Sequence, residues 1–272
     1  MQKKRITAIL GLVDRITYVT KFPAMEVNPE AQKLIVCLDL DDTLIDDNYK
    51  FELTFCDCIK TILEAFETRP PQIDDVLQRA RELDNYKLEN WEPKQAYSPA
   101  RLHATWIETY ESLALDQGVV VKDYVKMILQ GLVQKNFDPP YYIIPGSVEA
   151  LRELRDEHYP LHLITTGSPT VQLKKLQSTG LSKFFNEVHI LDTFDKSEKL
   201  QELKYKYSKK RVVMIGNSMR SDINPALKVG VDAIYIPRGS WHKFLAEPLN
   251  PNFKKIDSIS KLQTPLREIA AY

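Results

Sequence analysis

Two aspartates, Asp39 and Asp41, follow a short apolar run at residues 34–38. A run of this length and composition predicts a strand that is buried on both faces of a parallel sheet. Ligands of such sheets bind outside the carboxyl ends of the strands. Carboxylates at that place are costly to bury unless a cation or a reaction needs them. The pair therefore predicts metal-assisted or nucleophilic chemistry.

A calcium loop is one alternative for these acids. The pattern Asp39-x-Asp41-x-Thr43 begins like an EF-hand loop. However, Leu44 stands at the sixth position, where the loop needs glycine, and Lys50 stands at the twelfth, where it needs a bidentate glutamate. The sequence excludes a calcium loop. A plain acidic turn or a helix cap stays open on this segment alone.

Polar groups follow three later apolar runs in the same way. The first of these groups, Thr165-Thr166-Gly167, is followed by Ser168 and Pro169, which are typical of a helix N-cap and a first helical residue. Hydroxyls, a glycine amide and the positive end of a helix together predict an anion site. The groups at these three strand ends are Thr165-Thr166-Gly167, Asp195-Lys196 and the stretch from Gly216 to Asp222.

Each of these groups also has a purely structural explanation. Thr165 could cap the helix that follows it, and Asp222 could cap the helix that begins near Pro225. Lys196 could be a solvated surface lysine, and Lys199 is a nearby rival for any role in a site. Four such groups after four predicted parallel strands are nevertheless expected at one edge of one sheet. Their combination favours a shared site.

Composition excludes several classes of protein. Lys and Arg total 37, as do Asp and Glu, so no overall basic field attracts nucleic acid or an anionic membrane. No apolar run reaches membrane-spanning length. The start loosely resembles a signal peptide, but Asp14 and Arg15 interrupt it and no small-residue cleavage site follows. Cys37, Cys56 and Cys58 form neither a disulfide framework nor a zinc pattern. We expect a cytoplasmic protein with reduced thiols and no nucleic-acid or membrane partner.

The order of apolar patterns predicts the fold. Strand-like runs alternate with helical patterns after residue 143, and the run at 34–38 adds one more strand before them. This alternation indicates an α/β, Rossmann-like, doubly wound parallel sheet. Residues 46–142 show helical patterns and no convincing strand. The expected helices are 51–67, 72–87, 100–117, 121–136, 147–157, 169–178, 197–207 and 225–229, and the expected later strands are 161–165, 188–191, 212–215 and 233–236.

This organisation predicts two domains. Residues 1–45 and 143–272 form the expected catalytic core, in which residues 1–33 are an extension of unknown role. The extension is expected to add a helix or strand to the core. Residues 46–142 form the expected all-helical cap domain.

The four motifs, in this order, resemble those of the haloacid dehalogenase-like hydrolase superfamily with a helical cap. The resemblance covers roughly residues 34 to 240. Its first motif is the most specific, and the lysine is recognised mainly by its position. The matching segments are Asp39-Leu40-Asp41-Asp42-Thr43-Leu44, Leu163-Ile164-Thr165-Thr166-Gly167, Lys196 and Gly216-Asn217-Ser218-Met219-Arg220-Ser221-Asp222.

The resemblance implies a magnesium-dependent phosphatase that forms an aspartyl-phosphate. Asp39 would be the nucleophile. Asp41 would protonate the leaving group and then act as the base that activates water. Lys196 would stabilise the nucleophile and the developing charge. The residues that would bind the phosphoryl oxygens are Thr165, Thr166, Gly167 and Lys196.

The same resemblance implies a Mg²⁺ site made by Asp39, the Asp41 carbonyl and Asp222, with Asn217 beside them. A cation is needed because two anions in a water-poor site repel each other by several kcal/mol. Asn217 departs from the family pattern, since many relatives carry an acid there. An amide removes one negative charge, so we expect weaker Mg²⁺ binding and an Asn217→Asp variant that binds the ion more tightly.

The sequence does not identify the substrate. A small phosphomonoester fits a capped, closed site better than a phosphoprotein does. The candidates for substrate contacts in the helical segment are Tyr49, Arg101, His103, Trp106 and Tyr110, although aromatic residues there are expected to be mainly core.

Three alternatives stay open. A 2-haloacid dehalogenase is disfavoured by Asp41. A catalytically silent member of the fold would bind a phosphometabolite or a partner protein. A phosphotransferase or mutase would use the same intermediate. The oligomeric state is not readable from the sequence.

Overall fold

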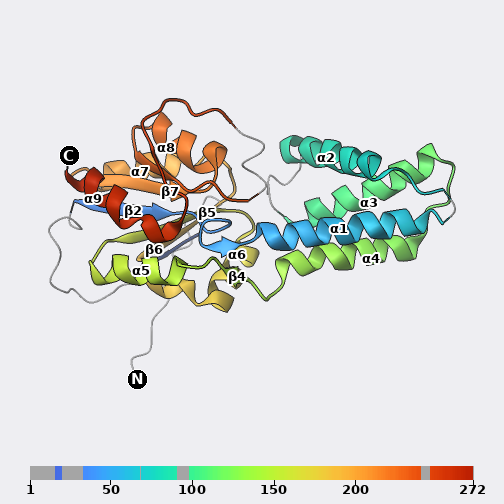
Figure 1. Cartoon of the computed structure of the whole chain (residues 1–272), viewed down its shortest axis with the longest axis horizontal. Coiled ribbons are helices and arrows are strands. Elements are labelled where there is room, and N and C mark those ends of the chain that lie inside the picture. Colours follow the sequence, from blue (N-terminus) through green and yellow to red (C-terminus); the bar gives the residue numbers. More distant parts are fainter. Residues whose placement is uncertain (1–15, 20–32, 68, 91–97, 240–245, 272) are drawn as a thin grey trace, which may run out of the picture. The chain divides into compact units, whose positions relative to one another are not determined.

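The computed structural model describes residues 16–19, 33–67, 69–90, 98–239 and 246–271. The chain divides into two compact units. The core unit comprises Met1–Asn48 and Tyr141–Tyr272, and the helical unit comprises Tyr49–Pro140. Figure 1 shows the elements of both units.

The core unit is built on a seven-stranded sheet with the order β1-β6-β5-β2-β7-β8-β9. The six strands from β6 to β9 in this order are parallel, and β1 pairs with β6 in the antiparallel direction. The strands are β1 (Ile16–Val19), β2 (Leu34–Leu38), β5 (Leu161–Thr166), β6 (Glu187–Leu191), β7 (Arg211–Gly216), β8 (Asp232–Tyr235) and β9 (Lys254–Lys255).

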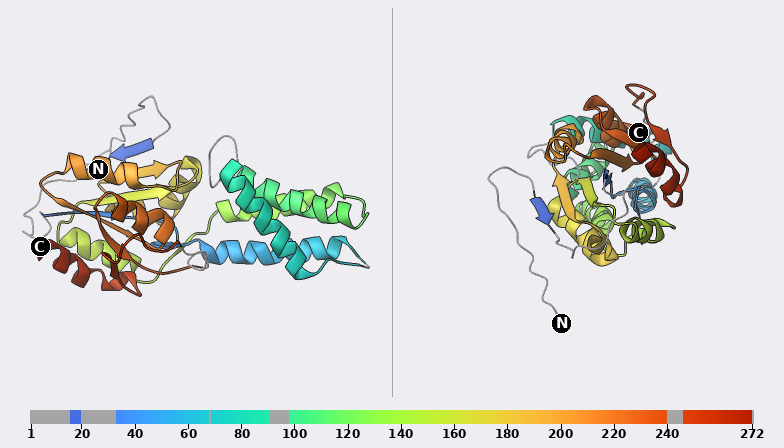
Figure 2. Two further views of the ribbon diagram at one scale, coloured as in Figure 1. Left: turned by 90° about the horizontal axis from the view of Figure 1, so that it is seen from above. Right: turned by 90° about the vertical axis from the view of Figure 1, so that its left-hand side faces the viewer.

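Helices cover both faces of this sheet, as the two views in Figure 2 show. Leu34, Val36 and Leu38 of β2 lie in a core that also contains residues of α5, α6 and α9. Ile35 and Cys37 of β2 lie in a second core with residues of α7 and α8. The helices are α5 (Ser147–Asp156), α6 (Pro169–Thr179), α7 (Ser197–Lys206), α8 (Asn224–Lys228) and α9 (Gln263–Ala271), with short helical segments at Leu181–Phe184, Met219–Ile223 and Ile259–Lys261.

The predicted doubly wound parallel sheet is confirmed. Strand β1 lies inside the predicted N-terminal extension, where we expected a helix or a strand; the rest of that extension, apart from Lys33, lies outside the described residues. Strand β9 and helix α9 were not predicted. Strand β9 consists of two exposed lysines, so it carries no apolar signal of a buried strand.

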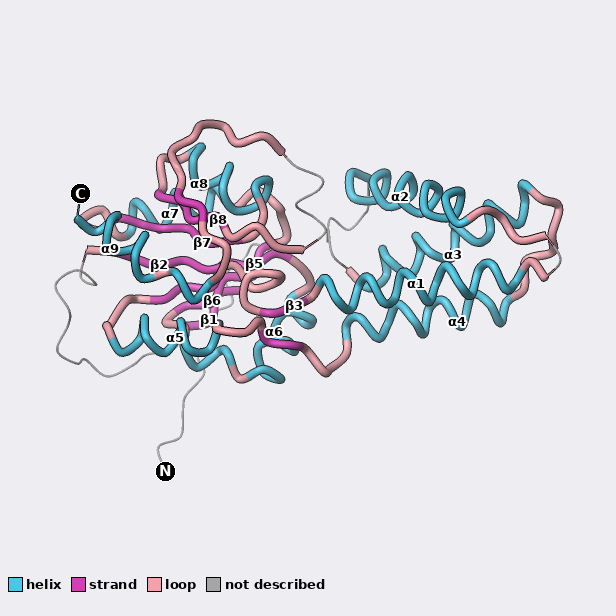
Figure 3. The backbone as a smooth tube through the Cα atoms, viewed as in Figure 1, coloured by secondary structure: helices cyan, strands magenta, loops and turns pink. Residues whose placement is uncertain are grey.

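The helical unit contains helix α1 from its second residue, α2, α3 and α4, and its described residues include no strand (Figure 3). Ser98 caps α3 as predicted, because its hydroxyl accepts a hydrogen bond from the Arg101 amide at 3.2 Å. The rings of Trp106 and Phe55 pack edge to face, with 5.1 Å between the ring centroids. The elements are α1 (Asn48–Ala65), α2 (Ile73–Asn90), α3 (Pro99–Asp116), α4 (Asp123–Gln134) and a short segment at Lys135–Phe137.

Two short strands of the core unit adjoin the helical unit in the chain. Strands β3 (Ile45–Asp46) and β4 (Tyr142–Ile143) pair in the antiparallel direction. Among the helices of the described chain, none combines the length and the apolar character that crossing a membrane requires.

Candidate active site

The loop after β2 is fixed by its own hydrogen bonds. Asp42 adopts a left-handed backbone conformation, with φ of 57°. Its amide donates to the Ile45 carbonyl at 2.7 Å, and its carboxylate accepts from the Asp47 and Asn48 amides at 3.1 and 2.8 Å. These bonds fix the turn that carries Asp39 and Asp41. Asp42 is therefore a structural residue of this loop.

Asp39 lies buried at the carboxyl end of β2. One of its carboxylate oxygens accepts a hydrogen bond from Lys196 at 2.5 Å, and the other accepts from the Thr43 hydroxyl at 3.3 Å. The Asp39 amide donates to the Ile215 carbonyl of β7 at 2.9 Å, which continues the pairing of the two strands. Asp39 is thus held on both sides at the middle of the sheet.

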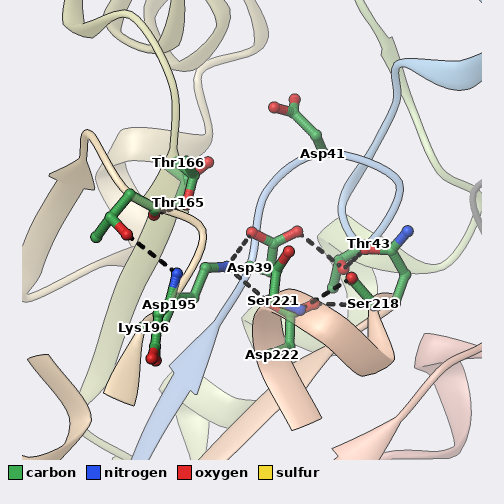
Figure 4. A network of polar contacts seen from close by, with 12 residues as sticks. Asp39, Asp41, Thr43, Thr165, Thr166, Asp195, Lys196, Ser218, Ser221 and Asp222 are labelled. Carbon is green, nitrogen blue, oxygen red and sulfur yellow. Dashed lines mark hydrogen bonds and ion pairs between the residues drawn. The ribbon is translucent and has the colours of Figure 1, made fainter. Parts of the chain in front are cut away.

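Lys196 joins Asp39 to Asp222. Its ammonium group lies 2.6 Å from the Asp222 carboxylate, and Figure 4 shows it between the two acids. Lys196 comes immediately before α7 and is 1 % exposed, so it is not the solvated lysine of the structural alternative. A Cβ at Gly216 would lie 2.2 Å from an Asp222 oxygen, so this position needs glycine.

Asp41 points away from Asp39 (Figure 4) and has different partners. One of its carboxylate oxygens accepts from Gln172 at 2.8 Å, and the other accepts from Lys175 at 2.8 Å. Lys175 also lies 3.0 Å from the Asp47 carboxylate. Both Gln172 and Lys175 come from α6, and the sequence analysis missed them. Their spacing of three residues on the buried side of a helix is the signal that could have found them.

The charges at this edge of the sheet are not balanced within the described site. The carboxylates of Asp39, Asp41, Asp47 and Asp222 outnumber the two ammonium groups by two charges. Burial raises the pKa of the Asp39 carboxyl; the Lys196 charge opposes this, and the Asp222 and Asp41 charges add to it. The site therefore favours an added cation.

The two lysines remain charged despite their burial. Burial alone would lower the pKa of Lys196, but the Asp222 and Asp39 carboxylates outweigh it and raise the pKa. The pKa of Lys175 is raised in the same way, because Asp41 and Asp47 outweigh its burial. Both ammonium groups can therefore stabilise anions.

The last residues of β5, Thr165 and Thr166, lie at the same edge (Figure 4). The Thr165 hydroxyl accepts a hydrogen bond from Gln172 at 2.8 Å and keeps a hydrogen to donate. The Thr166 hydroxyl donates to the Thr193 carbonyl at 2.9 Å. The predicted role of the Gly167 amide does not fit this structure, because that amide donates to the Leu191 carbonyl at 2.9 Å. Ser168 precedes α6 as expected, but its side chain makes no capping hydrogen bond.

Asn217 lies beside the acids as the sequence predicted. Its side-chain oxygen accepts from the Thr43 hydroxyl at 3.4 Å, and its amide nitrogen donates to the Arg238 carbonyl at 3.2 Å. Asp195 has a separate role, because its carboxylate accepts from the Ser197 amide at 2.8 Å and pairs with Lys228. The structure thus brings Asp39, Lys196, Asn217 and Asp222 into one connected network, with Thr43 as a member that was not predicted.

The oxygen donors fit Mg²⁺. Two buried carboxylates, from Asp39 and Asp222, face one cation, and this cation is the Lys196 ammonium group. Mg²⁺ prefers one or two carboxylates together with water and substrate oxygens. The amide oxygen of Asn217 adds a neutral donor of the same hard type.

The candidates in the helical unit are mainly core, as expected for the aromatic ones. Trp106 and Tyr110 are fully buried, and Arg101 is buried and paired with Asp84. Tyr49 is half exposed, and His103 is partly buried. Arg101 is therefore a structural residue of the helical unit.

Comparisons with known proteins show what this chain is similar to. The family model of the haloacid dehalogenase-like hydrolases matches residues 34–230. A solved haloacid dehalogenase-like hydrolase from Xanthomonas campestris is similar with a TM-score of 0.68 and 21% identity, and the match covers 88% of this chain and 96% of that one.

Two relatives are named for phosphate chemistry. A glyceraldehyde 3-phosphate phosphatase of Methanocaldococcus jannaschii is 23% identical over 213 residues, which cover 76% of this chain and 86% of that protein. A pyrimidine 5'-nucleotidase of Streptococcus pneumoniae is 28% identical over 99 residues. This second match covers 34% of the chain and spans less than half of the nucleotidase, 42% of its length.

Proposed function

The chain belongs to the haloacid dehalogenase-like hydrolases, and from this premise we propose that it is a Mg²⁺-dependent phosphatase of a small phosphomonoester. One observation carries the proposal. A buried aspartate, Asp39, is held by Lys196, and a second acid two residues later, Asp41, is held apart from it. Phosphoryl transfer through an aspartyl-phosphate needs a nucleophile and a separate acid and base.

Asp39 is the proposed nucleophile. Lys196 and Thr43 each bond one of its carboxylate oxygens, which fixes the rotamer of the side chain. The attacking oxygen forms a bond to phosphorus while the bond from phosphorus to the leaving oxygen breaks. Lys196 then lies beside the developing negative charge, where a positioned cation stabilises the transition state most strongly.

Asp41 is the proposed acid and base. In its protonated form it gives its proton to the leaving oxygen, and as a carboxylate it then takes a proton from the water that attacks the phosphoryl group. Gln172 and Lys175 hold its two oxygens and so fix their direction. Gln172 also donates to Thr165, which ties the acid and base to the proposed phosphate contacts.

Asp39, Asp222 and the Asp41 carbonyl are the proposed ligands of Mg²⁺, with Asn217 as an additional oxygen donor. When bound, the ion neutralises charge on the phosphoryl oxygens and the nucleophile. Thr165 and Lys196 are the proposed contacts of the phosphoryl group, whereas the Thr166 hydroxyl already donates its hydrogen to the Thr193 carbonyl. Since the Gly167 amide is already bonded to Leu191, we leave it out of this set.

The substrate class rests on two supports. The relatives named above are named for small phosphorylated molecules, a triose phosphate and nucleotides. The helical unit, Tyr49–Pro140, is our candidate for the cap that selects among such substrates. A 2-haloacid dehalogenase is disfavoured because Asp41, which dehalogenation does not need as an acid and base, is held here by Gln172 and Lys175.

Release of phosphate from an aryl phosphate tests the proposal. The wild type is expected to release phosphate with Mg²⁺ and not after chelation, and Asp39→Asn is expected to release none. Asp257→Asn is the matched control, since Asp257 is exposed and paired only with Lys261 among the contacts that the structure gives it. Chloride release from a 2-haloacid without phosphate release, or full activity of Asp39→Asn, would contradict the proposal.

A further inference from the structure

A second cluster of ionisable side chains lies away from the candidate active site. His162 comes from β5, and Glu187 and His189 come from β6. His162 lies directly opposite Glu187 in the register of the two parallel strands. Because Glu187 is the first residue of β6 and His162 the second of β5, the cluster lies towards the amino ends of the strands. Asp39, Thr165 and Lys196 lie at the carboxyl ends.

The three side chains share one face of the sheet. Leu161 and Leu163 belong to the core on the α5 side, and Ile164 belongs to the core on the α7 side. His162 therefore points to the α7 side, since side chains alternate along a strand. The same alternation places Glu187 and His189 on that side.

Three ligand atoms converge in this cluster. His162 Nδ1 lies 3.7 Å, and His189 Nε2 lies 3.3 Å, from the same oxygen of Glu187, Oε2. The ligand atoms of the three residues all lie within 4.8 Å of one another. A tetrahedral ion with bonds of about 2.1 Å places its ligand atoms about 3.4 Å apart. The two measured separations from Oε2 are close to that spacing.

The two oxygens of Glu187 are used differently. Oε1 accepts hydrogen bonds from Lys206 at 2.7 Å and Tyr207 at 3.3 Å. Oε2 faces the two histidines. Lys206 can therefore keep its contact, and keep Glu187 ionised, while Oε2 binds a cation. The carboxylate is already turned in the direction that a metal needs.

A nitrogen of His162 is buried without a hydrogen bond in the described part of the chain. His162 is 1 % exposed, and its Nδ1 atom has no hydrogen-bond partner among the described residues. Buried polar atoms are nearly always bonded, so such an atom calls for an explanation. A simple ion pair of Glu187 with His189 leaves this nitrogen unexplained, whereas a bound ion would satisfy it.

We propose that His162, Glu187 and His189 form a binding site for a divalent transition-metal ion of the Zn²⁺ type. Imidazole nitrogens suit Zn²⁺ and its neighbours, whereas Mg²⁺ prefers oxygen ligands. The neutral form of the imidazole ring is the form that binds metals. The ion would link β5 to β6 at the end of the sheet opposite the candidate active site.

Zinc titration in the presence of excess Mg²⁺ tests this site. The full chain is stripped with a chelator, supplied with Mg²⁺ to occupy oxygen-donor sites, and titrated with Zn²⁺ by calorimetry. We expect one Zn²⁺ per chain. Glu187→Gln and His162→Gln should each weaken binding more than about tenfold, since losing even an outer partner of a metal ligand costs about ten- to a hundredfold.

Cobalt substitution supplies a second readout. Co²⁺ in the wild type should give the intense visible absorption of a tetrahedral site, and Glu187→Gln should lose it. His103→Gln is the matched control, because this partly buried histidine belongs to the helical unit. Glu187→Gln has nearly the same shape as the wild type, so it decides the test if His162→Gln fails to fold. The proposal is overturned if the wild type binds no Zn²⁺ beside Mg²⁺, or if Glu187→Gln binds it equally well.

Discussion

The two aspartates of the loop after β2 are each held by a different buried lysine. Lys196 pairs with Asp39, whose side chain is 10% exposed, whereas Lys175 pairs with Asp41, whose side chain is 28% exposed. Lys196 also contacts Asp222, and Lys175 also contacts Asp47. Both members of the first pair are buried, whereas in the second pair the Asp41 side chain is partly exposed to solvent.

This difference in solvent access explains how two similar acids can have two roles. A nucleophile gains from a dry site, in which charges act strongly on each other. An acid and base that must exchange protons with water gains from partial exposure and a fixed direction. The environment of each acid thus fits the role proposed for it, as in other enzymes that use two carboxylates.

Loss of Lys196 should have the largest effect. The Lys196→Met change leaves Asp39 and Asp222 buried side by side without the ammonium group between them. We expect phosphate release to fall by about 10²–10³ and the free energy of unfolding to fall by about 3–5 kcal/mol. Kinetics and urea unfolding measure the two effects.

Lys199→Met is the matched control for that experiment. Lys199 lies on the same helix, α7, and pairs with Glu202, whose side chain is 53% exposed. This variant should keep its activity. A Lys196→Met enzyme with normal activity would mean that the buried ion pair of Asp39 and Lys196 has no part in the reaction.

Loss of Lys175 should have a smaller and more selective effect. Lys175→Met frees one oxygen of Asp41 but leaves Asp39 untouched. Alkyl phosphates need a proton on the leaving oxygen, whereas aryl phosphates leave without one. We expect alkyl phosphate turnover to fall about ten- to a hundredfold, part of the 10²–10⁴ that acid–base catalysis contributes.

The ratio of alkyl to aryl turnover separates this positioning role from general damage. Lys175→Arg keeps the charge and should restore much of the ratio. Equal losses on both substrates would show that Lys175 only stabilises the fold, and the contrast between the two lysines would then disappear.

Asn217→Asp should strengthen the proposed Mg²⁺ site beside Asp39. The change adds a negative charge beside Asp39 and Asp222, and it removes the hydrogen bond from Asn217 to the Arg238 carbonyl. We expect Mg²⁺ to bind about tenfold more tightly, which corresponds to about 1.4 kcal/mol. Activity measured against Mg²⁺ concentration gives the apparent affinity, and an unchanged or weaker value would count against Asn217 as a metal neighbour.

Asp42, the third acid of the loop, should affect stability alone. Burial raises the pKa of Asp42 to about 7, although the Asn48 amide opposes this. Stability from a raised carboxyl pKa is present below the unfolded value and is lost as pH rises through the folded one. The Asp42→Asn side chain cannot ionise, so this variant does not lose stability as pH rises. Its amide oxygen can still accept hydrogen bonds from the backbone amides.

The stability of Asp42→Asn relative to the wild type should therefore grow with pH between about 4 and 7, by at most about 1.4 kcal/mol per pH unit. Urea midpoints at about pH 4 and about pH 7 measure this growth. A pH-independent difference would mean that Asp42 is ionised throughout this range in the folded state.

The sequence predicted the parts of this molecule that follow from local patterns. Apolar runs predicted β2, β5, β6 and β7, and the polar groups at or after their ends predicted the candidates Asp39, Thr165, Lys196 and Asp222. Strand ends of a parallel sheet lie at one edge, so these groups could be expected together before any contact was known.

Long-range register and helix packing set the rest. The spacing of Gln172 and Lys175 places them on one side of α6, but their contact with Asp41 depends on how α6 packs against the loop after β2, which no local pattern encodes. His162 and His189 occur in runs that resemble buried strands, and their approach depends on how β5 and β6 pair. Strand β9 is two lysines long and carries no apolar pattern at all.

Transfer of a phosphoryl group to Asp39 tests the central claim most directly. In Asp41→Asn, an aryl phosphate can still react because its leaving group needs no acid, but hydrolysis should stall without the base. We predict that mass spectrometry of this variant, quenched after mixing with an aryl phosphate and Mg²⁺, finds one phosphoryl group on the peptide that contains Asp39. A phosphoryl group on another residue, or none while phosphate is still released, would contradict the account.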